Sequence, residues 1–196
     1  MQPFTTVSGI AVPLRRSGVD TDQICPSRYM KRITRTGYDD ALFATWRTDE
    51  QFILNTTPYS DGTILLAGAD FGIGSSREHA VWALWDYGFR AVVSPRFADI
   101  FRSNALKAGL LAAQVDKAGI EHLWAAAENH PNDHIQVDLH NRTIAAGATT
   151  IDFEIDDHSR DKLLAGLDDI DITLHHTDDI TAYEQQRPAW KPRVTG

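Results

Sequence analysis

Short apolar runs alternate with longer amphipathic segments through the middle of the chain. The runs that resemble buried strands are residues 64–68, 91–94 and 110–115. After the first run, residues 75–88 place apolar side chains at helical spacing and end at Gly88. After the second run we expect a helix that opens at Ser94 and Pro95, which favour N-cap and first-turn positions, and closes at Gly109. This order of elements predicts a βαβαβ unit with parallel strand pairing.

The segments on either side of this unit show weaker patterns. Strands are expected at residues 4–12, 134–140, 149–155 and 171–175. Helices are expected at residues 38–47, 118–130 and 178–187, and a further helix is expected to end at Gly166. We therefore predict one α/β domain over residues 1–196, with a mostly parallel central sheet, flanking helices and additional strands. Its C-terminal part, from about residue 159 to 196, is expected to be a helical extension.

Composition and charge narrow the possible partners. The chain has 196 residues, 42% of them hydrophobic, which is enough for one sizeable core. Its 27 acidic and 19 basic residues give a net charge of -8, and the basic residues are scattered, so we expect no nucleic-acid partner and no anionic membrane surface. No apolar stretch approaches the ~20 residues of a membrane span and no signal peptide is recognisable, so a cytoplasmic protein is expected.

A glycine-rich segment, GADFGIGSSREHA at residues 68–80, joins a predicted strand to a predicted helix. The free N–H groups and the positive dipole end of that helix should meet where Ser75, Ser76 and Arg77 project. Two hydroxyls beside a guanidinium can hold a carboxylate through parallel hydrogen bonds. The alternative is that Ser75 is only an N-cap, which forms a capping box with Glu78. The sequence leaves both hypotheses open.

Nucleotide-binding motifs fit this segment poorly. Arg77 stands where a dinucleotide fingerprint that contains Gly72 and Gly74 needs its third glycine. No Gly-Lys-Ser/Thr sequence follows, as a phosphate-binding loop requires. A non-catalytic nucleotide-binding or regulatory module built on the βαβ unit nevertheless remains an alternative function.

The run FGIGSSREHA resembles the signature of the swivelling domain of the aconitase superfamily. Further motifs follow the order found in small subunits of bacterial 3-isopropylmalate dehydratase, almost from the first residue to the last: VDTDQI, TRTG, LFATWR, DYGFRAVVSPRFADIFRSNALKAGLL, GLDDIDITL and AYEQQRPAW. The resemblance implies a swivelling β/β/α fold. It also implies a hydro-lyase of leucine biosynthesis that interconverts 2-isopropylmalate and 3-isopropylmalate, small dicarboxylate hydroxy acids, through a dehydrated intermediate.

The same resemblance implies a shared active site. The partner is the large subunit of a heterodimer, whose three cysteines hold a [4Fe–4S] cluster. In this chain Ser75 resembles the base that removes the carbon-bound proton, and Ser76 and Arg77 resemble its carboxylate-binding neighbours. Asp22 matches the acidic position of an upstream substrate-binding loop that also contains Thr21.

Substrate choice is expected to depend on the basic loop at residues 27–37, SRYMKRITRTG. The resemblance places this loop near the variable group of the substrate. Tyr29 and Met30 could then contact an isopropyl group, whereas Lys31 or Arg32 could face a distal carboxylate. A solvated basic loop is the alternative. A related dehydratase, acting on homoaconitate or methylmalate-type substrates, is a further alternative that differs mainly here.

The single cysteine and the histidines do not indicate a metal site. Cys25 is the single cysteine, which excludes an internal disulfide and an iron–sulfur site built from this chain's thiolates alone. We expect it to be a small buried residue rather than a nucleophile. The histidines, among them His79, His175 and His176, are expected to be structural or exposed. No metal ligand and no cofactor is therefore assigned to this chain alone.

Overall fold

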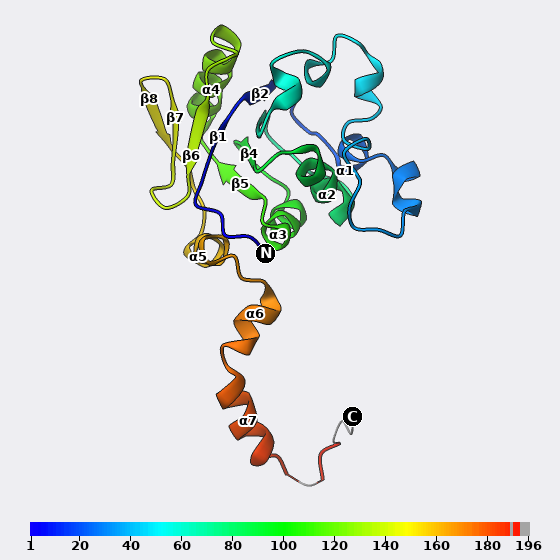
Figure 1. The fold of residues 1–196 in the computed structure, drawn as a ribbon, viewed down its shortest axis with the longest axis vertical. Helices are drawn as coiled ribbons and strands as arrows, with labels where there is room; N and C mark the ends of the chain where they lie inside the picture. Colours follow the sequence, from blue (N-terminus) through cyan, green and yellow to red (C-terminus); the bar gives the residue numbers. More distant parts are fainter. Residues whose placement is uncertain (189, 193–196) are drawn as a thin grey trace.

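The strands form two four-stranded sheets in the computed structural model, which describes residues 1–188 and 190–192 (Figure 1). The parallel sheet, in the order β2-β3-β4-β5, is made of Ala11–Leu14, Ile64–Ala67, Ala91–Ser94 and Leu111–Gln114. The antiparallel sheet, in the order β1-β6-β7-β8, is made of Thr6–Gly9, Ile135–Asp138, Thr143–Ala146 and Thr149–Asp152. The predicted βαβαβ unit and its parallel pairing are confirmed.

Two helices cover one face of the parallel sheet, and two others cover the opposite face together with the antiparallel sheet. The helices of the main body are α2 (Glu78–Tyr87), α3 (Asp99–Ala108), α4 (Lys117–Asn129) and α5 (Asp157–Ala165). Because strand side chains alternate between faces, Leu65 and Val92 join a core with α2 and α3. Their neighbours Leu66 and Val93 join a second core with α4, α5 and the antiparallel sheet. The layers are thus β, β and α, as expected.

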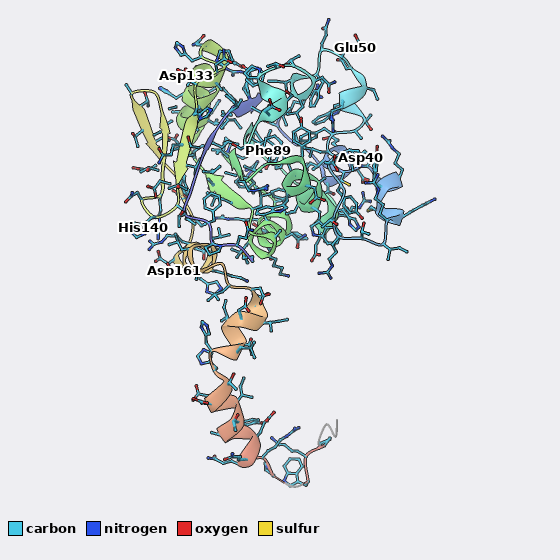
Figure 2. The ribbon with its side chains drawn as sticks, viewed as in Figure 1. Asp40, Glu50, Phe89, Asp133, His140 and Asp161 are labelled. Atoms are coloured by element: carbon cyan, nitrogen blue, oxygen red, sulfur yellow. The ribbon has the colours of Figure 1, made fainter. Side chains whose placement is uncertain are left out.

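Buried contacts hold these layers together. The indole Nε1 of Trp124 on α4 donates to the carbonyl of Leu66 in β3 at 2.8 Å. Phe89, labelled near the middle of the body in Figure 2, is fully buried and stacks on Tyr87, with ring centroids 5.5 Å apart. Full burial of a large apolar side chain stabilises the fold by ~1.5–3 kcal/mol. These cores therefore provide a stable platform for the loops at the edge of the parallel sheet.

The segment between β2 and β3 consists of short turns. Its elements are α1 (Thr21–Ile24) and the 3-10 turns Ser27–Lys31, Trp46–Thr48, Ile53–Asn55 and Tyr59–Asp61. The predicted helix at 38–47 is wrong, because Phe43 has a left-handed backbone with φ 45°. Its amide donates to the carbonyl of Ile24 at 2.8 Å, and its ring stacks on Trp46 at 5.0 Å. The apolar spacing reflects burial in irregular backbone.

Three further predictions about local structure are wrong. The strand at 4–12 is two strands, β1 and β2, which belong to different sheets, and the backbone changes sheet around Ile10, whose carbonyl accepts from Thr63 N at 3.0 Å. Ser94 does not begin a helix. It ends β4, where its hydroxyl donates to the carbonyl of Gly68 at 2.7 Å, and α3 begins at Asp99. Residues 171–175 are not a strand.

These last residues fall mostly in α6 (Asp169–Leu174), which a capping box at Asp168 initiates. Together with α7 (Thr177–Gln185) it forms an arm that extends away from the two sheets (Figure 1). The N-terminus bonds to the end of α5, just before this arm, where the Met1 ammonium donates to the carbonyl of Gly166 at 2.9 Å. No helix in the described part of the chain combines the length and apolar character needed to span a membrane.

Candidate active site

The loop between β3 and α2 carries Ser75, Ser76 and Arg77 at the edge of the parallel sheet. A glycine is required at one point of this loop, because a Cβ on Gly72 would lie 2.3 Å from the ring of Phe101, and φ is +79° there. Phe71, next to this glycine, is fully buried with its ring against Phe101 at 5.2 Å. The loop therefore lies tightly on α3 before it reaches the serines.

A second segment runs beside this loop and begins α1. The amide of Thr21 donates to the carbonyl of Ile73 at 2.9 Å, and the amide of Gly72 donates to the carbonyl of Val19 at 2.8 Å. A capping box between Asp20 and Gln23 starts the helix at this point. The backbone pairing brings the two predicted site segments, distant in sequence, to one place.

Four of the predicted site residues contact one another there. The hydroxyl of Thr21 lies 3.1 Å from Ser75 Oγ and 3.2 Å from the Ser75 carbonyl. The guanidinium of Arg77 forms an ion pair with the carboxylate of Asp22. Ser75 and Ser76 are exposed, whereas Thr21 is 2% exposed. The result is an open surface that carries the Ser75 hydroxyl and the Arg77 guanidinium. Thr21 contacts the hydroxyl from the buried side, and Asp22 pairs with the guanidinium.

The capping hypothesis for Ser75 is wrong. Helix α2 begins at Glu78 and its N-cap is Arg77, whose side chain makes no capping hydrogen bond to the described first turn of the helix. Ser75 lies outside the helix because its carbonyl accepts from the Arg77 amide in a tight turn, at 2.8 Å. The first N–H groups of α2 consequently receive no side-chain cap from Arg77 and favour an anion nearby.

The loop predicted to select the substrate begins with the 3-10 turn Ser27–Lys31. Tyr29 is half-buried, with the guanidinium groups of Arg28 and Arg32 each 4.9 Å from its ring centroid. Arg32 makes two hydrogen bonds of 2.7 Å to Asp40, which is labelled to the right of Phe89 in Figure 2. This contact lowers the pKa of the Asp40 carboxyl.

In the part of the chain that the structure describes, this loop makes no side-chain hydrogen bond to the loop that carries Ser75, Ser76 and Arg77, here called the serine loop. Met30 is half-buried and Lys31 is exposed. Within residues 1–188 and 190–192, no hydrogen bond joins the side chains of residues 29–32 to Ser75, Ser76 or Arg77. Their contact with substrate stays a prediction, and for Arg32 it would have to coexist with the pair to Asp40.

Two neighbours of the site were not predicted from the sequence. Asn104 of α3 donates to the carbonyl of Ser76 at 3.4 Å. His79 of α2 lies against the rings of Trp82 and Tyr38, with centroids 4.7 and 5.5 Å away. Burial lowers the pKa of His79. Asn104 had no local signal, since only the packing of α3 beside the loop brings it near.

The described residues of this chain do not fit an iron–sulfur cluster. They contain no group of three or more His, Cys, Asp or Glu residues placed to hold a metal ion. Cys25 is fully buried, and burial is the main cause that raises the pKa of its thiol to about 11. A thiol held in its protonated form is a poor ligand, and the expectation that Cys25 is a buried, unreactive residue agrees with this environment.

Comparison with known proteins identifies the family. A family model described as Aconitase C-terminal domain matches residues 1–118, one described as LeuD_N matches 121–157, and one described as the C-terminal domain of the 3-isopropylmalate dehydratase small subunit matches 169–196. The 3-isopropylmalate dehydratase small subunit of Paenarthrobacter aurescens is 62% identical over 194 residues, which cover 99% of this chain and 96% of the relative. This chain belongs to the 3-isopropylmalate dehydratase small-subunit family.

Other relatives agree with this assignment. The 3-isopropylmalate dehydratase small subunit of Micrococcus luteus is 62% identical over 192 residues, covering 98% of this chain and 96% of its own. The crystal structure of 3-isopropylmalate dehydratase from Methanocaldococcus jannaschii has a TM-score of 0.65 and 26% identity, and the match covers 91% of this chain and 99% of that one. The small-subunit resemblance and the aconitase-type fold class are confirmed, and the nucleotide-binding alternative loses its basis.

Proposed function

We propose that this chain is the small subunit of a 3-isopropylmalate dehydratase and that it supplies a serine base and a carboxylate anchor to an active site shared with a large subunit. The observation that carries the proposal is the contact of two segments at one open surface. The hydroxyl of Thr21 contacts the hydroxyl of Ser75, and the carboxylate of Asp22 forms an ion pair with Arg77. Family membership supports the substrate class, because the relatives carry this name over almost the whole chain.

Ser75 is assigned the proton transfer. A C–H bond next to a carboxylate is a weak acid, so its cleavage needs a positioned base. A free serine hydroxyl is too weakly acidic to ionise near neutral pH, and its ionised form needs donors and positive charge close by. The guanidinium of Arg77 lies two residues after Ser75 in the chain, and the free N–H groups at the start of α2 follow directly. Ser75 is exposed and can therefore reach a substrate above it.

Arg77 and Ser76 are assigned the substrate carboxylate. A guanidinium has five N–H donors, so a bond to Asp22 leaves others for a second carboxylate. Negative charge grows on the substrate carboxylate as its neighbouring carbon loses a proton. The same contacts therefore bind substrate and stabilise the transition state.

The large subunit is assigned the [4Fe–4S] cluster, which supplies a Lewis acid for the leaving hydroxide when it is bound. The environment of Cys25 supports this division of labour, since that thiol is buried on the inside of this chain. Residues 29–32 are assigned the variable end of the substrate. A related dehydratase with a different hydroxy diacid would differ there first.

The proposal is tested by reconstitution. The chain is coexpressed with the large subunit encoded by the same organism, the complex is purified anaerobically, and turnover is measured with 2-isopropylmalate, homoaconitate and a methylmalate. We expect copurification and turnover of isopropylmalate by the complex, and neither subunit alone should be active. A cluster-loaded complex that prefers another of the three acids would move the assignment to a related dehydratase. Absence of any complex would refute the small-subunit role.

A further inference from the structure

Thr21 lies buried directly behind the exposed Ser75. The residue is 2% exposed, and its Oγ1 lies 3.1 Å from Ser75 Oγ and 3.2 Å from the Ser75 carbonyl. We propose that Thr21 is a positioning residue that holds the Ser75 hydroxyl and stabilises its ionised form, rather than a substrate-binding residue. This inference deepens the proposed function and rests on Ser75 being the base.

The backbone fixes the position of the Thr21 hydroxyl. The Thr21 amide donates to Ile73 at 2.9 Å, and its carbonyl accepts from the amide of Cys25 at 3.0 Å. At Gly74, the residue before Ser75, an added Cβ would lie 3.5 Å from Thr21 Oγ1, and this glycine has φ +98°. The loop therefore passes closely over the threonine, and a substrate cannot replace Ser75 as its neighbour without moving both segments.

A threonine hydroxyl has a single proton and two lone pairs, so it can change the direction of its hydrogen bonds. When Ser75 is protonated, Thr21 donates to the Ser75 carbonyl and accepts from Ser75 Oγ. When Ser75 is ionised, the same Thr21 proton turns to Ser75 Oγ, which gives a charge-assisted bond. Thr21 keeps its own proton throughout. The proton that Ser75 takes from one substrate carbon is delivered by Ser75 to the other carbon on rehydration.

Charged groups near Ser75 set the background for its pH dependence. They are Asp20 and Asp22 at the start of α1, Arg77 in the loop, and Glu78 and His79 at the start of α2. From α3 the neighbouring residue is Asn104, which does not titrate. Replacement of the Thr21 hydroxyl by a methyl group leaves all of these charges in place. A change in the pH profile would then report on the hydroxyl itself.

The test uses the reconstituted heterodimer with Thr21→Val, which keeps the shape but loses the hydroxyl, and Thr21→Ser, which keeps the hydroxyl. Loss of one hydrogen bond to a charged group should lower kcat about 10–100-fold in Thr21→Val. The rise of kcat with pH should also move to higher pH, since ionised Ser75 loses a donor. Thr21→Ser should restore kcat to within about threefold, because the charge-assisted bond is retained. KM should change little in either variant.

The matched control is Thr63→Val, which removes a buried hydroxyl that has no hydrogen-bond partner among the described residues. It should leave kcat and the pH profile unchanged. If Thr21→Val does not fold, Thr21→Ala provides a second variant without the hydroxyl, and all rates are expressed per folded complex. An unchanged pH profile with a raised KM would overturn the inference in favour of a substrate contact. An unchanged profile with unchanged kcat per folded complex would overturn it in favour of a purely structural role.

A second comparison separates this inference from the proposed function. In a Ser75→Ala background, Thr21→Val should lower kcat no further, because the hydroxyl acts through Ser75. A full additional loss would overturn the positioning role while leaving Ser75 as the base. If Ser75→Ala alone keeps nearly full turnover, the base assignment itself fails, whatever Thr21→Val does.

Discussion

Asp22 and Arg77 stand 55 positions apart in the chain and form an ion pair beside the serine loop. The Arg77 side chain is 24% exposed and the Asp22 side chain is 56% exposed. A partly buried guanidinium thus already lies against one carboxylate before any substrate is present. The pair orients Arg77, and it also means that a substrate carboxylate must share the guanidinium with Asp22.

Arg77→Lys tests the role of the two-pronged geometry. Lysine keeps the charge but loses the planar set of donors, so we expect kcat to fall and KM to rise together, because the carboxylate is held in both ground and transition states. The measurement is steady-state kinetics of the heterodimer. Arg96→Lys is a matched control, since Arg96 pairs with Asp70 on the surface and should tolerate the change. An effect on KM alone would indicate that Arg77 only binds substrate.

Ser75→Ala should lower turnover by ~10²–10⁴-fold, the range for a lost general base, with substrate binding largely intact. Stability should change little, because Arg77 and not Ser75 is the N-cap of α2. A lost N-cap would instead cost ~0.5–2 kcal/mol and lower Tm. Both kcat per folded complex and Tm are therefore measured. A kcat within about threefold of wild type, far below the range for a lost base, would remove Ser75 as the base.

Cys25 should resist thiol reagents in the folded protein. It is fully buried, and its thiol pKa of about 11 leaves almost no thiolate at pH 8. We expect a disulfide-exchange reagent to label it slowly in buffer and rapidly in urea. Cys25→Ala should lower Tm without changing turnover per folded complex. Fast labelling of the native subunit would contradict this environment.

His79 should make the fold less stable at mildly acidic pH. Burial lowers its folded pKa below the unfolded value of about 6.5, so the unfolded chain binds more protons as the pH falls through this range. The stability that its neutral form contributes is present above pH ~6.5 and declines as the pH falls toward the folded pKa. His79→Phe keeps a ring against Trp82 and cannot become charged. Its Tm should fall less than that of wild type between pH 7.5 and 5.5.

The sequence predicted the parts of the fold that depend on local pattern. The apolar runs became β3, β4 and β5, and Gly88 and Gly109 end α2 and α3 as expected. Irregular backbone was not predictable in this way. Phe43 is as apolar as a helix residue, and only its position against Ile24 and Trp46 explains its left-handed backbone.

The same limit applies to the site. The resemblance of the serine loop to its family predicted Ser75 and Arg77 as site residues. The sequence did not indicate which side chains contact them. The contacts of Thr21 with Ser75 and of Asp22 with Arg77 join residues 54 and 55 positions apart. Such contacts follow from the pairing of two loops in space. The prediction of Ser94 as an N-cap was wrong for a related reason, because its hydroxyl donates to the carbonyl of Gly68, directly after the neighbouring strand β3.

The first residues of the chain have their partners near the end of the two-sheet body. Strand β1 pairs with β6, and the Met1 ammonium bonds to Gly166, 165 positions away. A ribosome releases the N-terminus first, so this strand leaves the exit tunnel long before its partner is made. Contacts of such sequence separation form slowly, and an unpaired strand edge invites association with other chains. During synthesis, the parallel sheet can therefore form first, and β1 stays unpaired until β6 and β7 have been made.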